Sequence, residues 1–447
     1  MSHKYSRRQF LEQAAMAGGA LAVGGTAALA AKPALPNPRN SGIEHIVVMM
    51  MENRSFDHLL GWLPGADGRQ AGLTYTDAAG VAYSTYPLAP DYQGCGHNDP
   101  DHSYDGARIE YNGGACDGWL RTSESTLPSG ATDLYPIGYY GQSDVAFLAH
   151  AAPGWTACDR YFSGILGPTF PNRFYMHAAQ TDRLSNTFDL STLPTIWDRL
   201  AAAGLTGRYY FSDAPFLGLW GLKYTSISRP FGQFLEDCAN GTLPQVSFVD
   251  PKFIDEESGT SNDDHPFSDI RNGEVFMNAV YTAVTQSPAW KHTVLVINFD
   301  EWGGFFEHVP PPPAPVPKDG ADPDGRLGFR VPALIVSPYA ARGVVSSTQF
   351  DHTSILRMIE WRWNLAPLTV RDATANNLAT ALDFGKPNRT APLYAVTGVF
   401  GGACPNTTDT PPPAGAAGNQ PAPPAAAAAE NEWIAVRALA QSYGWNF

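Results

Sequence analysis

An apolar run that ends in charged and amide residues is the feature that most constrains this chain. Residues 43–51 (IEHIVVMMM) are rich in β-formers and too few to span a membrane, so they predict a buried central strand of a parallel sheet. Glu52 and Asn53 follow directly, and open α/β sheets bind ligands at the carboxyl ends of their strands. We therefore expect both side chains to be oxygen ligands facing a site. The alternative is a capped strand–helix junction, with Asn53 or Ser55 as the helix N-cap and Asp57 in the first turn.

Other apolar segments alternate between strand and helix patterns along the chain. Further strands are predicted at 207–211, 246–249, 293–299 and 331–336. Helices are predicted at 194–203, 272–285, 355–363 and 430–443, and a helical run at 174–180. This alternation predicts an α/β fold: a doubly wound, mostly parallel central sheet flanked by helices.

The first thirty residues have the pattern of a twin-arginine signal peptide. Arg7 and Arg8 precede a weakly apolar Ala/Gly-rich run and a small-residue cleavage site. A membrane anchor is the weaker alternative, because the run is short and rich in glycine. We expect a periplasmic or secreted protein exported by the twin-arginine machinery. The catalytic domain is expected at 42–400, a Pro/Ala-rich linker at 405–429 and a terminal helix at 430–447.

Charge and cysteine content exclude several classes of function. The 447 residues carry a net charge of −14, which argues against a nucleic acid or an anionic membrane held by bulk electrostatics. The five cysteines form no CxxC pair, so a zinc ribbon or a thioredoxin has no support. An oxidising destination permits one or two disulfides, with Cys95–Cys116 the expected pair, and one thiol must be left over.

Two predicted strands each end in a polar pair, Glu52-Asn53 and Asp300-Glu301. If the strands are neighbours, three carboxylates and an amide converge, and the carboxylates would raise one another's pKa. One divalent cation would be the simplest way to offset the repulsion between these carboxylates. The all-oxygen ligand set favours Ca²⁺, Mg²⁺ or Mn²⁺, with Zn²⁺ left open. The alternative is that the acidic pair forms ion pairs with Arg54 or Arg173.

Hydroxyl and imidazole groups complete the candidate machinery. Pro168 and Pro171 stiffen the segment around Thr169, which predicts a hydroxyl on a fixed loop. A threonine becomes a nucleophile only when a metal or a base lowers its pKa; otherwise Thr169 is a turn residue. Histidines on predicted site-side loops can contact a phosphoryl group or protonate a leaving oxygen; these are His102, His265, His308 and His352.

Seven short motifs occur in order: ENRSFDH (52–58), DPDHS (99–103), NGGACDG (112–118), GPTFPNR (167–173), DDHP (263–266), DEWGGFFEHV (300–309) and DHTS (351–354). Together they resemble the phosphoesterase family of bacterial phospholipases C, plant non-specific phospholipases C and related acid phosphatases. The resemblance covers about residues 42–385 and implies an alkaline-phosphatase-like fold.

The resemblance also implies roles for individual residues. Metal ligands would be Glu52, Asn53, Asp300 and Glu301, and the nucleophile on the same cation would be Thr169. Residues lining the phosphoryl pocket, and acting in catalysis, would be His102, Asp250 and His265. Apart from the resemblance, we expect substrate contacts from Asn172, His308 and His352. Two departures stand out: Glu307 replaces the aspartate of the family's usual DHV, and Thr169 replaces the serine of the acid phosphatases.

Three functions follow as expectations. The first is a secreted, metal-dependent phospholipase C that acts through a phosphothreonine, with a phospholipid or small phosphoester as substrate and transient contact with a membrane surface. The second is an acid phosphatase with the same site. The third is a non-catalytic periplasmic binding relative, which has no use for a nucleophile beside a metal.

Overall fold

The computed structural model describes residues 34–122, 131–256, 258–404 and 424–446, with side chains of the last segment described from residue 432. The chain divides into two compact units, Met1–Ala34 and Leu35–Phe447, and the fold lies in the second. The predicted signal peptide and most of the predicted linker lie outside the described residues. Among the helices that are described, none is long and apolar enough to cross a membrane.

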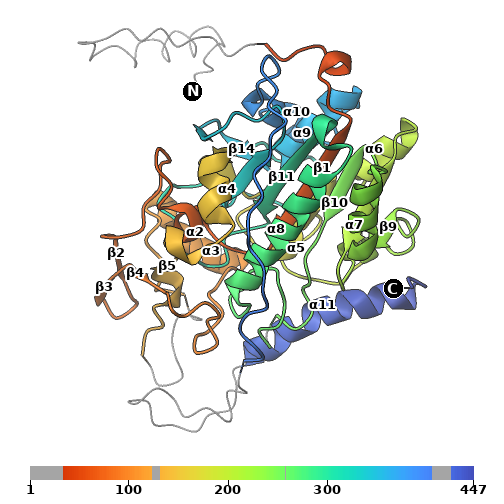
Figure 1. Cartoon of the computed structure of the whole chain (residues 1–447). Coiled ribbons are helices and arrows are strands. Elements are labelled where there is room, and N and C mark those ends of the chain that lie inside the picture. The colour runs from red at the N-terminus through yellow and green to blue at the C-terminus, as the bar shows by residue number, and fades with distance from the viewer. Residues whose placement is uncertain (1–33, 123–130, 257, 405–423, 447) are drawn as a thin grey trace, which may run out of the picture. The chain divides into compact units, whose positions relative to one another are not determined.

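An eight-stranded sheet forms the centre of this unit, in the order β13-β6-β12-β11-β1-β10-β8-β9 (Figure 1). Only β12 runs antiparallel to its neighbours. The strands in this order are β13 (Val344–Ser346), β6 (Thr156–Cys158), β12 (Ala333–Val336), β11 (Thr293–Phe299), β1 (His45–Met51), β10 (Val246–Val249), β8 (Gly207–Phe211) and β9 (Ser228–Pro230). The predicted doubly wound, mostly parallel α/β class is confirmed.

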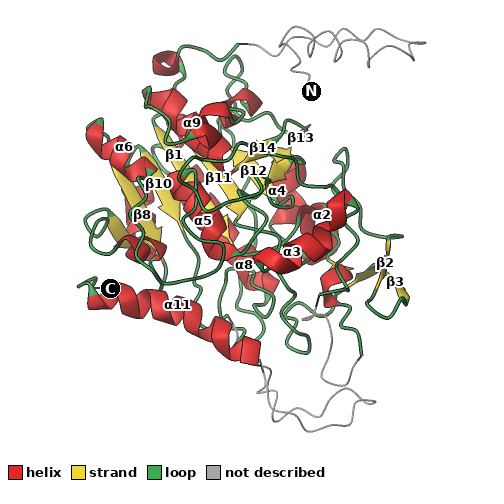
Figure 2. Ribbon diagram, turned by 180° about the vertical axis from the view of Figure 1, so that it is seen from behind, coloured by secondary structure: helices red, strands yellow, loops and turns green. Residues whose placement is uncertain are grey.

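Helices cover both faces of the sheet. One layer contains α7 (Phe231–Asn240) and α8 (Ile270–Gln286), which pack on each other in front of the strands in Figure 1. The other contains α5 (Thr169–Ala178), α6 (Ile196–Ala202) and α9 (His352–Trp363), seen in front of the sheet in Figure 2. With helices on both sides, β1 and β11 are buried along almost their whole length, as continuous apolar runs in a parallel sheet require.

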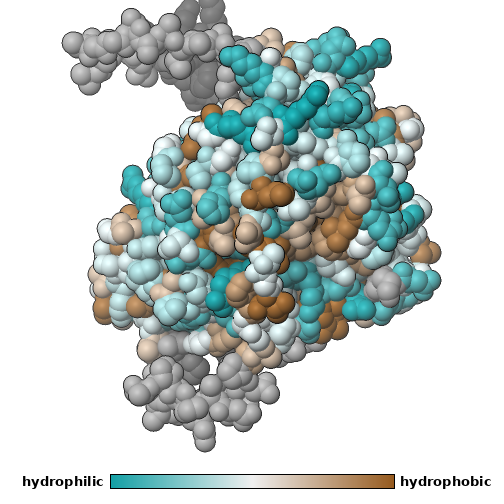
Figure 3. All heavy atoms as spheres, viewed as in Figure 1, coloured by the Kyte–Doolittle hydropathy of each residue, from teal (hydrophilic) through white to brown (hydrophobic). Residues whose placement is uncertain are grey.

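Further helices and strands surround these layers. The helices are α2 (Phe56–Leu60), α3 (Tyr104–Tyr111), α4 (Leu148–Gly154), α10 (Val370–Thr374) and α11 (Pro424–Ser442). The strands are β2 (Thr74–Thr76), β3 (Ala82–Ser84), β4 (Tyr86–Pro87), β5 (Gly138–Tyr139), β7 (Tyr161–Phe162) and β14 (Phe350–Asp351), which form three two-stranded sheets. On the face shown in Figure 3, hydrophobic residues lie in small groups among hydrophilic ones, so this face offers no broad apolar surface.

Two local predictions differ from the structure. Thr169 was expected on a loop before a helix at 174–180, but it is the first residue of α5, with Pro168 as the N-cap. Proline is tolerated in the first turn of a helix because the N–H it lacks would have no partner inside the helix. The C-terminal helix α11 begins at Pro424, ahead of the predicted start at residue 430.

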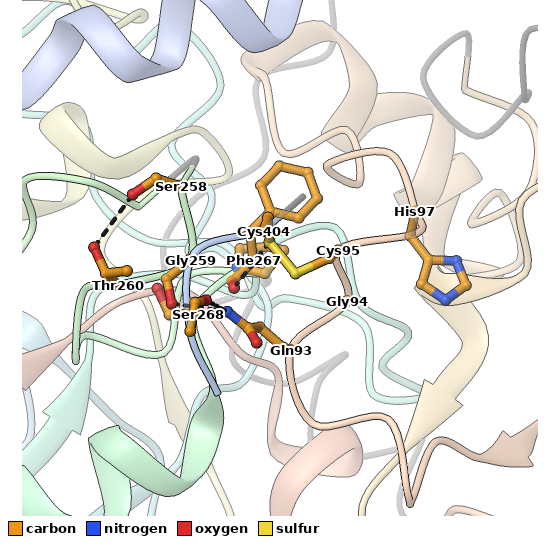
Figure 4. The surroundings of a disulfide bond; sticks show 12 residues. Gln93, Gly94, Cys95, His97, Ser258, Gly259, Thr260, Phe267, Ser268 and Cys404 are labelled. Carbon is orange, nitrogen blue, oxygen red and sulfur yellow. Dashed lines mark hydrogen bonds between the residues drawn. A yellow bond between two sulfur atoms is a disulfide. The ribbon is translucent and has the colours of Figure 1, made fainter. Parts of the chain in front are cut away.

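The predicted Cys95–Cys116 disulfide is wrong. Cys95 is bonded to Cys404, which lies 309 residues further along the chain (Figure 4). Cys116 is a buried free thiol, as are Cys158 and Cys238. The segment before Cys404 follows α8, where Asn278 Nδ2 donates to the carbonyl of Val396 at 3.0 Å. This long return path brings Cys404 beside Cys95. The spacing of the cysteines along the sequence does not predict this pairing.

Candidate active site

The carboxyl ends of β1 and β11 bring three carboxylates together. The two strands are parallel neighbours with Met51 opposite Phe299, so the residues that follow them, Glu52 and Asp300, emerge side by side. Oxygen atoms of Glu52, Asp300 and Glu301 lie within 4.8 Å of one another, and all three residues are buried. The condition that the two strands be neighbours is therefore met. Ser55 also caps α2, so the strand–helix junction and the acidic cluster coexist.

Arg173 of α5 is the cation that pairs with this cluster. Its Nη2 lies 2.8 Å from Glu52 Oε1, its Nε 3.0 Å from Asp300 Oδ2 and its Nη1 3.1 Å from Asp250 Oδ1. The alternative of an ion pair with arginine thus holds for Asp300. Arg54 instead donates to the backbone carbonyls of Asp264 and His265.

One guanidinium does not balance the buried acids. Burial and the charge of Glu52 raise the pKa of Asp300 well above its usual value, although Arg173 opposes the shift. Burial raises the pKa of Glu301 to about 7, against the opposing effect of His102. Groups crowded in this way favour protonation unless further positive charge is present.

The residues at this site fit a hard divalent cation. Within the part of the chain that the structure describes, the Asn53 side-chain oxygen and nitrogen and Glu301 Oε1 are buried without a hydrogen-bond partner of good geometry. An orphaned buried acceptor is costly, and a cation would satisfy it. Carboxylate and amide oxygens are the ligands that Ca²⁺, Mg²⁺ and Mn²⁺ prefer.

Thr169 lies at the edge of the same cluster. Its Oγ1 donates to Glu52 Oε2 at 3.3 Å, and its place at the N-terminus of α5 puts its own backbone N–H and the positive end of the helix dipole at the site. Asn172 fixes the preceding turn, since its Oδ1 accepts from Ile165 N at 3.0 Å and its Nδ2 donates to Gly167 O at 2.6 Å.

A second polar group adjoins the carboxylates. It contains Asp99, His102 and His265, and the two imidazole rings lie 6.1 Å apart. His102 Nε2 is 4.0 Å from Glu301 Oε1, which joins the two groups. Burial lowers the pKa of His265 well below its usual value, and the nearby charge of His102 acts in the same direction. This shift favours the neutral form of His265, which offers one N–H donor and one acceptor.

The remaining predicted site residues have other surroundings. Asp250 follows β10 and accepts from Tyr209 Oη at 2.5 Å in addition to Arg173. His352 is fully buried at the start of α9, and its Nε2 lies 3.1 Å from the carbonyl oxygen of Phe299. These contacts hold elements of the fold together, and the catalytic role of Asp250 and the substrate role of His352 stay predictions.

His308 belongs to a third polar group, together with Asp57 and Glu307. His308 Nδ1 lies 2.5 Å from Asp57 Oδ2, and Arg330 Nη2 lies 2.7 Å from Glu307 Oε1 and 3.2 Å from Asp57 Oδ1. Arg330 supplies the buried positive charge of this group. Glu307 therefore takes part in an internal ion-pair network, and the predicted substrate contact of His308 stays a prediction.

Sequence reasoning named Arg173 only as a possible ion-pair partner, and it missed two other residues near the carboxylates. Arg173 lies inside the GPTFPNR motif, where an arginine four residues after Thr169 falls on the same helix face. Glu432 and Trp433 come from α11 and approach the site from the far end of the chain, where Arg173 Cζ is 5.4 Å from the Trp433 ring centre. No local pattern around residues 432 and 433 indicates this.

Comparison with known proteins identifies the family. The model of the Phosphoesterase family matches residues 43–366. The chain belongs to this family. Non-specific phospholipase C6 of Arabidopsis thaliana is 32% identical over 381 residues, which cover 75% of this chain and 71% of that protein. Phospholipase C A of Mycobacterium tuberculosis (strain ATCC 25618 / H37Rv) is 31% identical over 464 residues, which cover 87% of each protein.

Solved structures are more distant from this phosphoesterase. A phosphonate monoester hydrolase of Agrobacterium radiobacter has a TM-score of 0.36 and 11% identity, over 77% of this chain and 78% of that one. A protein in the alkaline phosphatase superfamily from Vibrio parahaemolyticus has a TM-score of 0.36 and 9% identity, over 74% and 70%. The fold assignment rests on the strand order given above. Family membership makes the chain a hydrolase of phosphoric ester bonds.

Proposed function

We propose that this phosphoesterase is an exported, metal-dependent phospholipase C that uses Thr169 as its nucleophile. The observation that carries the proposal is the 3.3 Å hydrogen bond from Thr169 Oγ1 to Glu52 Oε2, at the edge of a buried set of oxygen ligands. Relatives named phospholipase C, similar over most of their length, favour a phosphodiester of a lipid as the substrate.

Glu52, Asn53, Asp300 and Glu301 would hold one divalent cation, with Thr169 beside it. Bound there, the cation would lower the pKa of the Thr169 hydroxyl and offset the negative charge of the phosphoryl group. Arg173 keeps Glu52 and Asp300 in place through its ion pairs. Asn172 holds the turn that orients Thr169.

In the proposed reaction, Thr169 Oγ1 attacks phosphorus, and the bond from phosphorus to the diacylglycerol oxygen breaks. The leaving oxygen needs a proton, and His102, beside Glu301, is the candidate donor. The lowered pKa of His265 suits that residue to a hydrogen-bonding role instead. Water then attacks the phosphothreonine and releases the phosphorylated head group. The backbone N–H of Thr169 and the positive end of the α5 dipole can stabilise the negative charge that develops on the phosphoryl oxygens.

Export by the twin-arginine route is part of the proposal. Arg7, Arg8 and the Ala/Gly-rich run after them support it. The Cys95–Cys404 disulfide gives independent support, because disulfides persist in oxidising compartments such as the periplasm and the extracellular space.

A paired assay on the purified protein tests the function. Wild type and Thr169→Ala are given p-nitrophenylphosphorylcholine, a diester, and p-nitrophenyl phosphate, a monoester, each with and without a chelator. We expect the wild type to hydrolyse the diester, and we expect either Thr169→Ala or the chelator to abolish this activity. Turnover of the monoester alone would move the assignment to a phosphatase. Activity that survives Thr169→Ala would remove the proposed nucleophile.

A further inference from the structure

The C-terminal helix α11 is docked on the catalytic unit by its apolar side chains. Ala440 packs so closely on Gly218 that a Cβ at Gly218 would lie 2.9 Å from the Ala440 Cβ. Val436 and Ala440 are fully buried, and Trp445 Nε1 donates to the carbonyl of Gly221 at 3.0 Å. Figures 1 and 2 both show α11 running below the strands. These contacts hold the helix in one position.

The docked helix places Trp433 against the arginine of the active site. The Trp433 ring stacks on Phe253 with centres 3.9 Å apart and planes 7° from parallel. Arg173 Cζ lies 4.6 Å from the centre of the Phe253 ring and 5.4 Å from that of Trp433. Trp433 is only 3% exposed. Trp433 is therefore fixed beside Arg173, which pairs with Glu52 and Asp300.

The neighbouring residue, Glu432, is connected to the nucleophile by two hydrogen bonds. Asn186 Nδ2 donates to Glu432 Oε2 at 2.7 Å, and Asn186 Oδ1 accepts from Phe170 N at 2.8 Å. Phe170 directly follows Thr169. Glu432 is itself only partly buried.

Glu432 adds an acidic group close to the N-terminus of α5. Burial raises its pKa to about 7; Asn186 and His102 oppose the shift, while the charges of Glu52 and Asp99 add to it. Glu432 is therefore within electrostatic range of residues in both polar groups. At a pH above its pKa the carboxylate repels anions, and the repulsion grows with the charge of the ligand.

We propose that Glu432 is a specificity-determining residue that selects monoanionic phosphodiesters over dianionic phosphomonoesters. A phosphomonoester carries a second negative charge above a pH of about 6, whereas a diester cannot ionise again. This inference rests on the proposed phospholipase function, and it assigns to α11 the discrimination against phosphatase substrates.

The test measures anion binding without turnover. Isothermal titration calorimetry at pH 8 compares inorganic phosphate, largely a dianion, with dimethyl phosphate, a monoanion, on the metal-loaded wild type and Glu432→Gln. Glutamine keeps an acceptor for Asn186. We expect the substitution to tighten phosphate roughly tenfold and dimethyl phosphate roughly threefold, because the repulsion scales with ligand charge.

Two further variants act as controls. Glu432→Asp keeps the charge and should keep the wild-type preference. Glu236→Gln removes one exposed carboxylate from α7 and should change neither affinity. Equal factors for the two anions, no change, or weaker phosphate binding in Glu432→Gln would overturn the inference. A wild type that binds both anions but hydrolyses no diester would instead refute the phospholipase assignment.

Discussion

Replacing Arg173 by methionine should show whether Arg173 and a divalent cation neutralise the same buried carboxylates. Arg173 makes three ion pairs of 2.8–3.1 Å with buried carboxylates, and breaking a buried network of this kind costs about 3–5 kcal/mol. Unfolding a domain of roughly 400 residues has an entropy of about 0.8–0.9 kcal/mol/K. The metal-free variant should therefore melt about 4–6 °C below the metal-free wild type.

Adding a divalent cation should reverse part of this loss. The variant site holds one positive charge fewer, so it should bind the cation more tightly than the wild type does. Each tenfold gain in affinity adds about 1.4 kcal/mol of stabilisation at a saturating concentration, or about 1.6 °C at the entropy given above. Differential scanning calorimetry with and without Ca²⁺, Mg²⁺, Mn²⁺ or Zn²⁺ measures both effects.

The matched control is Arg371→Met. Arg371 is equally buried and faces Asp322 at 3.6 Å, away from the acidic cluster. Its replacement should lower the melting temperature without changing the shift that the cation produces. If the cation shifts Arg173→Met and wild type by the same amount, Arg173 and the cation do not share the site, and the reasoning is refuted.

Other substitutions test separate parts of the structure. The double variant Cys95→Ser with Cys404→Ser should lose about 2–5 kcal/mol of stability in urea unfolding, since the disulfide closes a long loop; an unchanged midpoint would mean that the bond does not form in the isolated protein. Thr169→Ser should keep turnover, whereas Thr169→Val should lose at least roughly 10³-fold; similar rates in the two would contradict a hydroxyl nucleophile. Burial raises the pKa of Glu274 to about 8, so between its unfolded pKa and pH 8 the folded state binds the extra proton and stability falls as pH rises. Glu274→Gln should reduce this pH dependence of the free energy of unfolding, measured by chemical denaturation from pH 6 to 9. The same pH dependence in the variant and the wild type would exclude Glu274 as its source.

The sequence was sufficient for the parts of the fold that depend on local patterns. The strands at 207–211, 246–249 and 293–299 have the predicted bounds, because each is a short apolar run between breaks. The meeting of Glu52 with Asp300 was also predictable, since the ends of parallel neighbouring strands lie at one edge of a sheet.

What the sequence did not reveal depends on contacts between distant segments. Cys404 pairs with Cys95 only because the chain returns along α8. Arg173 was named as one possible partner of Asp300, but its bonds to Glu52 and Asp250 required the folded arrangement of α5 and β10. Glu432 lies beyond the motif-bearing region, so only the docking of α11 brings it to the site.

A covalent intermediate on Thr169 is the central claim, and acid-quench mass spectrometry tests it most directly. Wild type is mixed with excess p-nitrophenylphosphorylcholine, quenched in acid within the first turnovers and digested. The account predicts that the peptide containing Thr169 gains the mass of one phosphorylcholine group, and that a chelator or Thr169→Ala prevents the gain. An unmodified Thr169 peptide under conditions of rapid turnover, or the same adduct on another residue, would contradict it.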